Sequence, residues 1–203
     1  MQAGRFRLAE KSPDAILTVD IVEGVVAFKL LRAEGLLKEE PRRGTFVVSL
    51  TADDVREIYG LRAALEGRAA RLLARERDTK ALARLRELAD QIDAAVAAGD
   101  AAAVSRADLA FHHGLCEQCG NSRILEVFDR YVPTLRALLR LDEHVLRSLD
   151  DVSRQHRPLL EAIEGGEEDK AARLLAEHSE EAGGLIAQVV ATADRPAAKV
   201  VDR

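Results

Sequence analysis

Four side chains in the second half of the sequence are metal ligands by type. Asp108 and His112 are four residues apart in a stretch with helical periodicity, so both project from one face of a helix and can bind the same ion. His156 and His178 each lie on the apolar side of a later predicted helix. Three imidazoles and one carboxylate that meet inside a bundle suit Zn²⁺ or another borderline divalent metal. Spacing alone also fits, and favours, a second interpretation, in which each His is a hydrogen-bonded residue of the core or surface.

Two cysteines form a Cys-x-x-Cys pair, Cys116 and Cys119. A closed zinc site needs two further thiolates or imidazoles, and a thioredoxin-like redox site needs a βαβ setting that this helical stretch lacks. We therefore interpret both as free thiols, buried or partly exposed. His113 points about 100° away from His112 on a helix. We assign no chemistry to His113 or His144.

Arg62 lies in a strongly apolar helical stretch, four residues before Glu66. One interpretation is an ion pair between these two residues on the surface. The other is a guanidinium that turns inward as a bidentate clamp for a carboxylate. The sequence contains no phosphate-binding loop, dinucleotide fingerprint or nucleophile elbow.

The residues from Thr51 onward are predicted to form six helices with short connections. Thr51–Asp54 has the pattern of a capping box, Asp78 or Thr79 caps the second helix, Gly99 stops it, and Asp100 caps the third. Pro133 is expected to kink the fourth helix, and Pro158 implies a bend or a late start in the fifth. The first, second and third helices are expected at about 51–75, 79–98 and 101–119, the fourth from about 122 to beyond Leu138, and the last two at about 151–164 and 167–190. Such a pattern predicts an antiparallel bundle.

The first 50 residues follow another pattern. Ala27–Leu37 is predicted to be a helix that ends at Gly35, and Lys38–Leu50 reads as a strand, a Pro-Arg-Arg-Gly turn and a second strand. A helix that runs into a basic hairpin is typical of a winged helix. Lys38, Arg42 and Arg43 fit phosphate contacts and a solvated turn about equally well.

Composition excludes several classes of protein. The 203 residues include two Cys and 47% apolar residues, too little cysteine for a disulfide scaffold and too many apolar residues for a disordered chain. No apolar run is long enough to span a bilayer and no signal peptide is evident, so we expect a cytoplasmic protein without a membrane partner.

The net charge is −5, but residues 1–50 carry eight basic and seven acidic side chains. Any contact with nucleic acid must therefore be local.

Several motifs in order resemble one family. The stretch Leu30–Ala74 resembles the junction between the winged helix and the effector domain of GntR-family transcriptional regulators of the FadR subgroup. Asp108-x-x-x-His112, the Gly120-Asn121 break, Gln155–Ile163 and Ala172–Ala182 resemble the signature of that effector domain, the FCD domain. The resemblance covers about residues 27–190.

The resemblance implies a fold and a site. The fold is mostly α, a six- to seven-helix antiparallel bundle of FCD type at 51–190, preceded by a small, divergent winged helix-turn-helix at 1–50 and followed by a flexible tail at 191–203. The metal ligands are Asp108, His112, His156 and His178, with Zn expected and Ni or Mn as alternatives. A small carboxylate effector binds beside the metal, with Arg62 and Asn121 at positions that can face it.

The resemblance also implies a homodimer that reads two half-sites of operator DNA. The residues expected to contact DNA are Lys29, Arg32, Lys38, Arg42, Arg43 and Gly44. The N-terminus departs from the family, because the counterpart of the recognition helix, Thr18–Phe28, has no basic base-reading side chain and contains acidic Asp20 and Glu23. Such a helix binds poorly in a groove lined by phosphates.

We therefore expect a metabolite-responsive transcriptional regulator. The alternative is a ligand-binding protein of the same fold that has lost sequence-specific DNA binding. A metal centre with open positions can also activate water, but no acid or base is evident outside the expected ligands, so we expect no enzyme.

Overall fold

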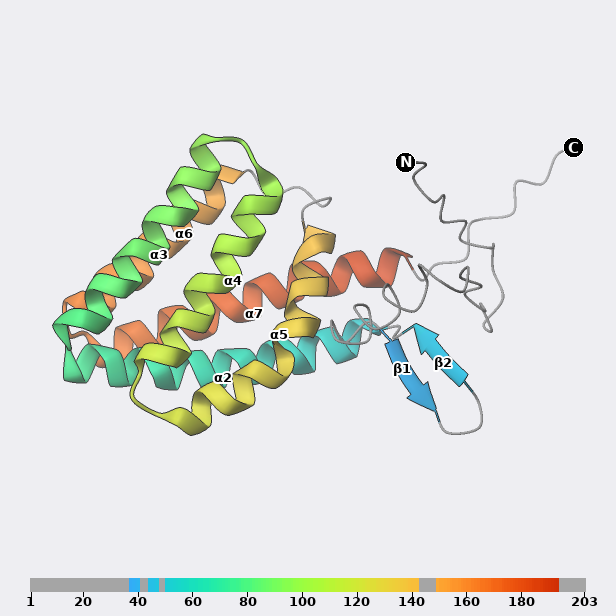
Figure 1. Ribbon diagram of the computed structural model, residues 1–203, viewed down its shortest axis with the longest axis horizontal. Helices are drawn as coiled ribbons and strands as arrows, with labels where there is room; N and C mark the ends of the chain where they lie inside the picture. Colours follow the sequence, from blue (N-terminus) through green and yellow to red (C-terminus); the bar gives the residue numbers. More distant parts are fainter. Residues whose placement is uncertain (1–36, 41–43, 48–49, 143–148, 194–203) are drawn as a thin grey trace, which may run out of the picture. The chain divides into compact units, whose positions relative to one another are not determined.

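The computed structural model describes residues 37–40, 44–47, 50–142 and 149–193. The chain divides into two compact units, residues 1–49 and residues 50–203. In the first unit the described residues form a β-hairpin, and in the second they form a bundle of helices (Figure 1).

The hairpin pairs β1 (Leu37–Glu40) with β2 (Gly44–Val47) in an antiparallel register that sets Leu37 opposite Val47 and Glu40 opposite Gly44. This confirms the hairpin predicted from the sequence. The helix predicted before it lies outside the described residues, apart from Leu37, which opens β1 instead. The winged helix as a whole therefore stays a prediction.

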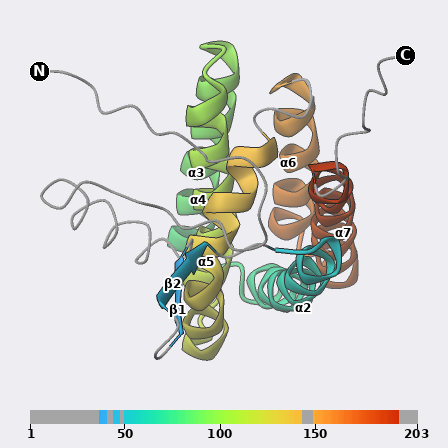
Figure 2. The same ribbon diagram turned by 90° about the vertical axis from the view of Figure 1, so that its right-hand side faces the viewer.

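Six helices make up the described part of the second unit. They are α2 (Ala52–Glu76), α3 (Thr79–Ala97), α4 (Ala101–Gln118), α5 (Ser122–Asp142), α6 (Leu149–Glu164) and α7 (Glu168–Ala193). The longest two, α2 and α7, lie along each other, and α3 packs against α4 and α6 (Figures 1 and 2). The predicted helical bundle is confirmed, and no helix within the described ranges is both long and apolar enough to cross a bilayer.

The helix starts follow from capping side chains. Thr51 and Asp54 form the predicted capping box, in which the Thr51 hydroxyl accepts from the Asp54 backbone N–H at 3.1 Å and the Thr51 backbone N–H donates to the Asp54 carboxylate at 2.8 Å. Asp78 and Asp100 cap α3 and α4 as predicted, with side-chain oxygens that accept from backbone N–H groups of the first turn. Between these two helices Gly99 adopts a φ of 66°, the left-handed conformation that ends α3.

The two prolines inside helices have different consequences. Pro133 lies inside α5, which changes direction along its length in both views, as expected from the missing backbone donor and the clash with the preceding turn. Pro158 lies inside α6, which already begins at Leu149. A late helix start at Pro158 is therefore wrong. The last helix also runs to Ala193, so residues 191–193, expected in the tail, are helical.

The core is apolar and continuous between the helices. Gly183 of α7 allows the closest approach to α2, because a Cβ at that position would lie 2.4 Å from the Cβ of Tyr59. The largest fully buried apolar side chains are Tyr59, Leu85, Ile92, Phe111, Leu115, Phe128, Leu135, Leu138, Ile163, Leu175 and Ile186. Six polar residues are buried with them, and a buried polar group requires a partner. These are Arg62, Glu66, Asp108, His112, His156 and Ser179.

Candidate metal centre

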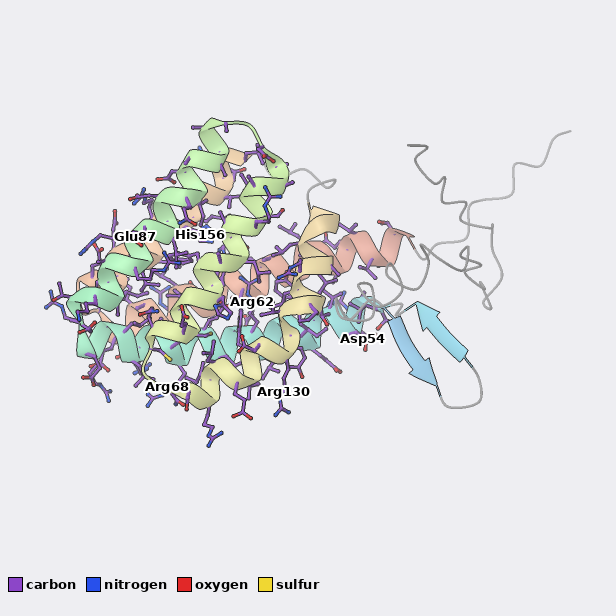
Figure 3. All side chains as sticks on the ribbon, viewed as in Figure 1. Asp54, Arg62, Arg68, Glu87, Arg130 and His156 are labelled. Carbon is purple, nitrogen blue, oxygen red and sulfur yellow. The ribbon has the colours of Figure 1, made fainter. Side chains whose placement is uncertain are left out.

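The six buried polar residues and the half-buried His178 come from four helices and meet in one layer of the bundle. Arg62 and Glu66 lie on α2, Asp108 and His112 on α4, His156 on α6, and His178 and Ser179 on α7. In Figure 3 Arg62 and His156 are labelled within the bundle, whereas the exposed side chains of Arg68 and Arg130 project from it.

Four of these side chains, which we call the Asp–His cluster, converge on a common point: Asp108, His112, His156 and His178. Each offers one ligand atom, and these atoms all lie within 4.8 Å of one another. The Nε2 atom of His112 lies 3.2 Å from Nε2 of His156 and 3.3 Å from Nε2 of His178. The Asp108 Oδ1 atom lies 3.0 Å from Nε2 of His156. The sequence predicted these four residues together, and the structure brings them together.

Hydrogen bonds assign the ring protons of two of the histidines. The Nδ1–H of His156 donates to the Val152 carbonyl at 2.7 Å, one turn earlier on α6. The Nδ1–H of His112 donates to the Glu66 carboxylate at 2.8 Å. In the neutral ring the other nitrogen then carries a lone pair, so with both rings neutral the Nε2 lone pairs of His112 and His156 lie 3.2 Å apart, beside the Asp108 carboxylate. A cation between them removes this repulsion and uses both nitrogens as ligands.

The surroundings lower the pKa values of two imidazoles and of the carboxylate in the cluster. Burial lowers the pKa of His112, as does the nearby Arg62 guanidinium. Burial and the two neighbouring imidazoles hold the pKa of His178 well below its usual value. Burial alone would raise the pKa of Asp108, but His112 and His156 outweigh it and lower that pKa strongly. Neutral imidazoles beside an ionised carboxylate are the forms that bind metal.

The donor set fits a divalent transition metal. Three imidazole nitrogens and one carboxylate oxygen suit Zn²⁺ and neighbouring borderline ions, and they leave coordination positions for water or a ligand. The cluster can thus hold a metal ion, and its donors alone do not select one metal among Zn, Ni and Mn.

The sequence analysis missed Glu66 as a site residue. Its side chain is fully buried, as is that of Arg62, with which it forms an ion pair of 2.7 Å between Nε and Oε1. The predicted ion pair between Arg62 and Glu66 is present, but it lies in the core and not on the surface, and Arg62 turns inward. Burial alone would raise the pKa of Glu66, but Arg62 and His112 outweigh it and lower that pKa. Glu66 follows Tyr59 by seven residues on the same face of α2, but this spacing does not distinguish a buried pair from an exposed one.

A small cavity adjoins the Asp–His cluster. Its volume is about 40 Å³, and its polar lining consists of Arg62, Ser105, Asp108, Gln155, His156 and His178. The Nη2 atom of Arg62 is buried and has no hydrogen-bond partner. A buried guanidinium nitrogen without a partner is costly, so an added acceptor near Arg62 would be stabilised.

The remaining expected site residues lie elsewhere. Asn121 does not line this cavity, and its side-chain Oδ1 accepts from the Arg123 backbone N–H at the start of α5. The geometry does not support the expected contact between Asn121 and an effector. Lys29, Arg32, Arg42 and Arg43 lie outside the described residues, while Lys38 lies in β1 and Gly44 opens β2.

The two cysteines and His113 agree with the sequence analysis, which assigned no chemistry to them. Cys116 and Cys119 are free, buried thiols, as predicted. His113 bonds to Asp129 at 2.9 Å near the surface, and His144 lies outside the described residues.

Comparison with known proteins identifies the family. Residues 57–181, more than half of the chain, match the FCD domain. The chain belongs to the GntR family, in the FadR subgroup that carries an FCD domain. The Asp–His cluster and the adjoining cavity therefore lie within the FCD domain of a transcriptional regulator.

Curated relatives of this FCD protein are regulators and not enzymes, in agreement with the expectation from the sequence. The "Probable D-xylose utilization operon transcriptional repressor" of Paenarthrobacter nicotinovorans is 29% identical over 152 residues, which span 75% of this chain and 66% of that protein. The "Gluconate operon transcriptional repressor" of Bacillus licheniformis is 23% identical over 165 residues, spanning 79% and 68%.

Solved structures share the fold of this FCD protein. A GntR-family regulator from Pseudomonas syringae pv. tomato aligns with a TM-score of 0.59 and 23% identity, covering 82% of this chain and 70% of that one. The E. coli protein McbR/YncC aligns with a TM-score of 0.68 and 19% identity, covering 81% and 83%.

Proposed function

We propose that the chain is a metabolite-responsive transcriptional repressor whose FCD domain binds a divalent metal and a small organic acid. The metal ligands are Asp108, His112, His156 and His178. The observation that carries the proposal is the convergence of their ligand atoms in the bundle interior, with the Nε2 atoms of His112 and His156 3.2 Å apart.

The effector in this proposal is a small carboxylate. It binds an open metal position with one oxygen and the unpartnered Nη2 atom of Arg62 with another, since guanidinium and carboxylate groups match in geometry and charge. Ser105 and Gln155 also line the cavity. The volume of about 40 Å³ favours an acid of a few non-hydrogen atoms over a sugar acid in the conformation described.

The output in this proposal is a change in DNA affinity. The relatives that are named as repressors support DNA as the partner. A homodimer presents two N-terminal units to two operator half-sites, with contacts from Lys29, Arg32, Lys38, Arg42, Arg43 and Gly44. Effector binding shifts the population between two spacings of these units, because the effector has different affinities for the two states.

A thermal-shift experiment tests the sensor. Zn²⁺ is expected to raise the melting temperature of the metal-free protein, and acids such as acetate, pyruvate and citrate are then screened on the Zn²⁺-loaded protein. At least one small acid should raise the melting temperature further, and Arg62→Met should abolish this second shift. Arg68→Met, an exposed arginine on the same helix, is the matched control. A second shift that survives in Arg62→Met would contradict the role of Arg62.

A DNA-binding experiment tests the output. The full chain is used to select sequences from a random pool of duplexes, and its affinity for the selected DNA is measured against salt. Recovery of a palindrome that is bound in a salt-sensitive manner is expected. Recovery of no preferred sequence would favour the alternative, a ligand-binding protein that has lost sequence-specific DNA binding.

A further inference from the structure

The carboxylate of Glu66 connects three helices but is not a ligand candidate of the Asp–His cluster. Its side chain is fully buried on α2. The Oε1 atom accepts from the Arg62 Nε–H at 2.7 Å. The Oε2 atom accepts from the Nδ1–H of His112 on α4 at 2.8 Å and from the Ser179 hydroxyl on α7 at 3.0 Å. Both oxygens are thus used, and every bond they make is one in which the carboxylate accepts.

We propose that Glu66 is the positioning residue of the metal centre. It holds the His112 ring in the Nδ1–H tautomer and in the orientation that presents Nε2 to the ion. This inference rests on the proposed metal site, and it assigns a residue that donates no atom to the ion. A ligand histidine whose second nitrogen bonds a carboxylate is fixed in orientation and becomes a stronger base toward the metal.

The surroundings of His112 leave this task to Glu66. The imidazole is fully buried, and its ring stacks on that of His178 with centroids 5.1 Å apart and an angle of 11° between the planes. Stacking of this kind permits the ring to turn in its own plane or to carry its proton on either nitrogen. The hydrogen bond to Oε2 of Glu66 fixes both the orientation of the ring and the nitrogen that carries the proton. The His156 ring is fixed in the same way by its hydrogen bond to the Val152 carbonyl of its own helix. The His112 ring depends instead on a side chain from another helix.

The pairing with Arg62 explains how a carboxylate can be buried here. An unpaired buried carboxylate would be strongly destabilising, and Arg62 supplies the counter-charge through Oε1. The Glu66 carboxylate therefore bonds Arg62, which lines the cavity, through Oε1 and the metal-ligand candidate His112 through Oε2. The metal ligand and the proposed effector clamp share a common anchor.

The first test compares Zn²⁺ affinities by competition with a chromogenic chelator. Glu66→Gln keeps the size of the side chain but cannot accept from Arg62 and His112 on two equivalent oxygens. It is expected to bind Zn²⁺ about 10- to 100-fold more weakly than the wild type. Glu57→Gln, an exposed glutamate on the same helix, is the matched control and should not change the affinity. Equal affinities of the wild type and Glu66→Gln would overturn the proposal.

A double-mutant cycle separates positioning from a merely structural ion pair. If Glu66 acts through His112, Glu66→Gln should not weaken Zn²⁺ binding further in the His112→Ala background. In the His156→Ala background it should weaken Zn²⁺ binding by the same factor as in the wild type. Equal losses in both backgrounds would mean that Glu66 supports the fold in general, which overturns the proposal. Absence of Zn²⁺ binding by the wild type would instead overturn the metal site itself, so the two failures are distinguishable.

If Glu66→Gln does not fold, a measurement on the wild type still tests the proposal. Long-range ¹⁵N–¹H correlation spectra of the Zn²⁺-loaded protein report the tautomer of each histidine, with His112 assigned by comparison with His112→Gln. The proposal expects a proton on Nδ1 of His112 and a metal-bound Nε2. A proton on Nε2 of His112 would overturn it.

Discussion

At the scale of single residues, the FCD domain places ionisable side chains where water cannot reach them. Such groups keep their charge only when neighbours compensate for lost hydration. Glu66 and Arg62 compensate each other, and His112, His156 and Arg62 lower the pKa of Asp108 against the effect of burial.

Asp93 on α3 provides a pH-dependent link to α6, the helix that carries His156. Burial alone would raise the pKa of Asp93, but the Ser153 hydroxyl and the Arg157 guanidinium outweigh it and lower that pKa. A lowered folded-state pKa stabilises the fold above the usual aspartate value of about 4 and loses this effect as the pH falls. We expect Asp93→Asn to lower the free energy of unfolding by about 1 kcal/mol at pH 7. The difference from the wild type should shrink below about pH 4.

Urea denaturation of both proteins at pH 7 and at about pH 3 measures this difference. Asp53→Asn, at an 87% exposed side chain, serves as the control and should change stability little at either pH. A difference for Asp93→Asn that grows as the pH falls would contradict the assignment.

The cysteines are expected to be inert in the native protein. Burial is the main cause that raises the pKa of both thiols, most strongly for Cys116. The thiolate is the reactive form, so alkylation by iodoacetamide at pH 7.5 should be at least about 100-fold slower in the native state than in denaturant. Mass spectrometry over time measures both rates. Rapid labelling of either cysteine in the folded protein would disprove this expectation.

The sequence predicted the cluster but not its support, for a physical reason. Spacing alone left Asp108, His112, His156 and His178 open between a metal site and ordinary hydrogen-bonded residues, and the resemblance to the FCD domain selected them as metal ligands. An arginine and a glutamate four residues apart occur on exposed helix faces as well as buried ones. Only the packing of α4 and α7 against α2 decides that Glu66 is buried, and this packing is not contained in the local spacing.

At the scale of elements, the packing of α7 on α2 holds the site together. Glycine lets the two helices approach at Gly183, where an added Cβ would meet the Tyr59 side chain at 2.4 Å. The adjacent Gly184 has no atom within 4 Å of such a Cβ. Neighbouring glycines on one helix therefore differ in whether they tolerate a side chain.

Two alanine substitutions test this difference. Gly183→Ala is expected to destabilise the fold by about 1–3 kcal/mol, because Tyr59 must move out of a packed core. Gly184→Ala should be neutral or stabilise by up to about 1 kcal/mol, because alanine favours the helix over glycine. Thermal unfolding of the metal-free proteins measures both. Similar effects of the two substitutions would argue against the close contact between α2 and α7.

Helix ends were predictable wherever a side chain marks them. Thr51, Asp78 and Asp100 cap helices as expected because their oxygens satisfy free backbone donors. For α6 the sequence left two starts open, about Asp151 or a late start at Pro158, and the helix begins at Leu149, close to the first. A helix can continue through proline when the packing of its apolar face compensates for the lost bond.

At the scale of the whole molecule, charge separates the two units. Residues 1–50 carry eight basic and seven acidic side chains, whereas the other 153 carry 22 and 28. The FCD domain therefore repels DNA, and affinity in the proposed regulator must come from the N-terminal unit. Composition alone predicted this separation, while the structure of the winged helix stays a prediction.

The metal content of the full chain tests the central claim most directly. The protein is purified without chelator or metal-affinity tag, in parallel with the double variant Asp108→Ala, His112→Ala, and both are analysed for Zn, Ni and Mn. We predict about one equivalent of one of these metals per wild-type chain and its loss in the variant, with helical circular dichroism retained. A wild type without metal, or equal metal in both proteins, would contradict the account.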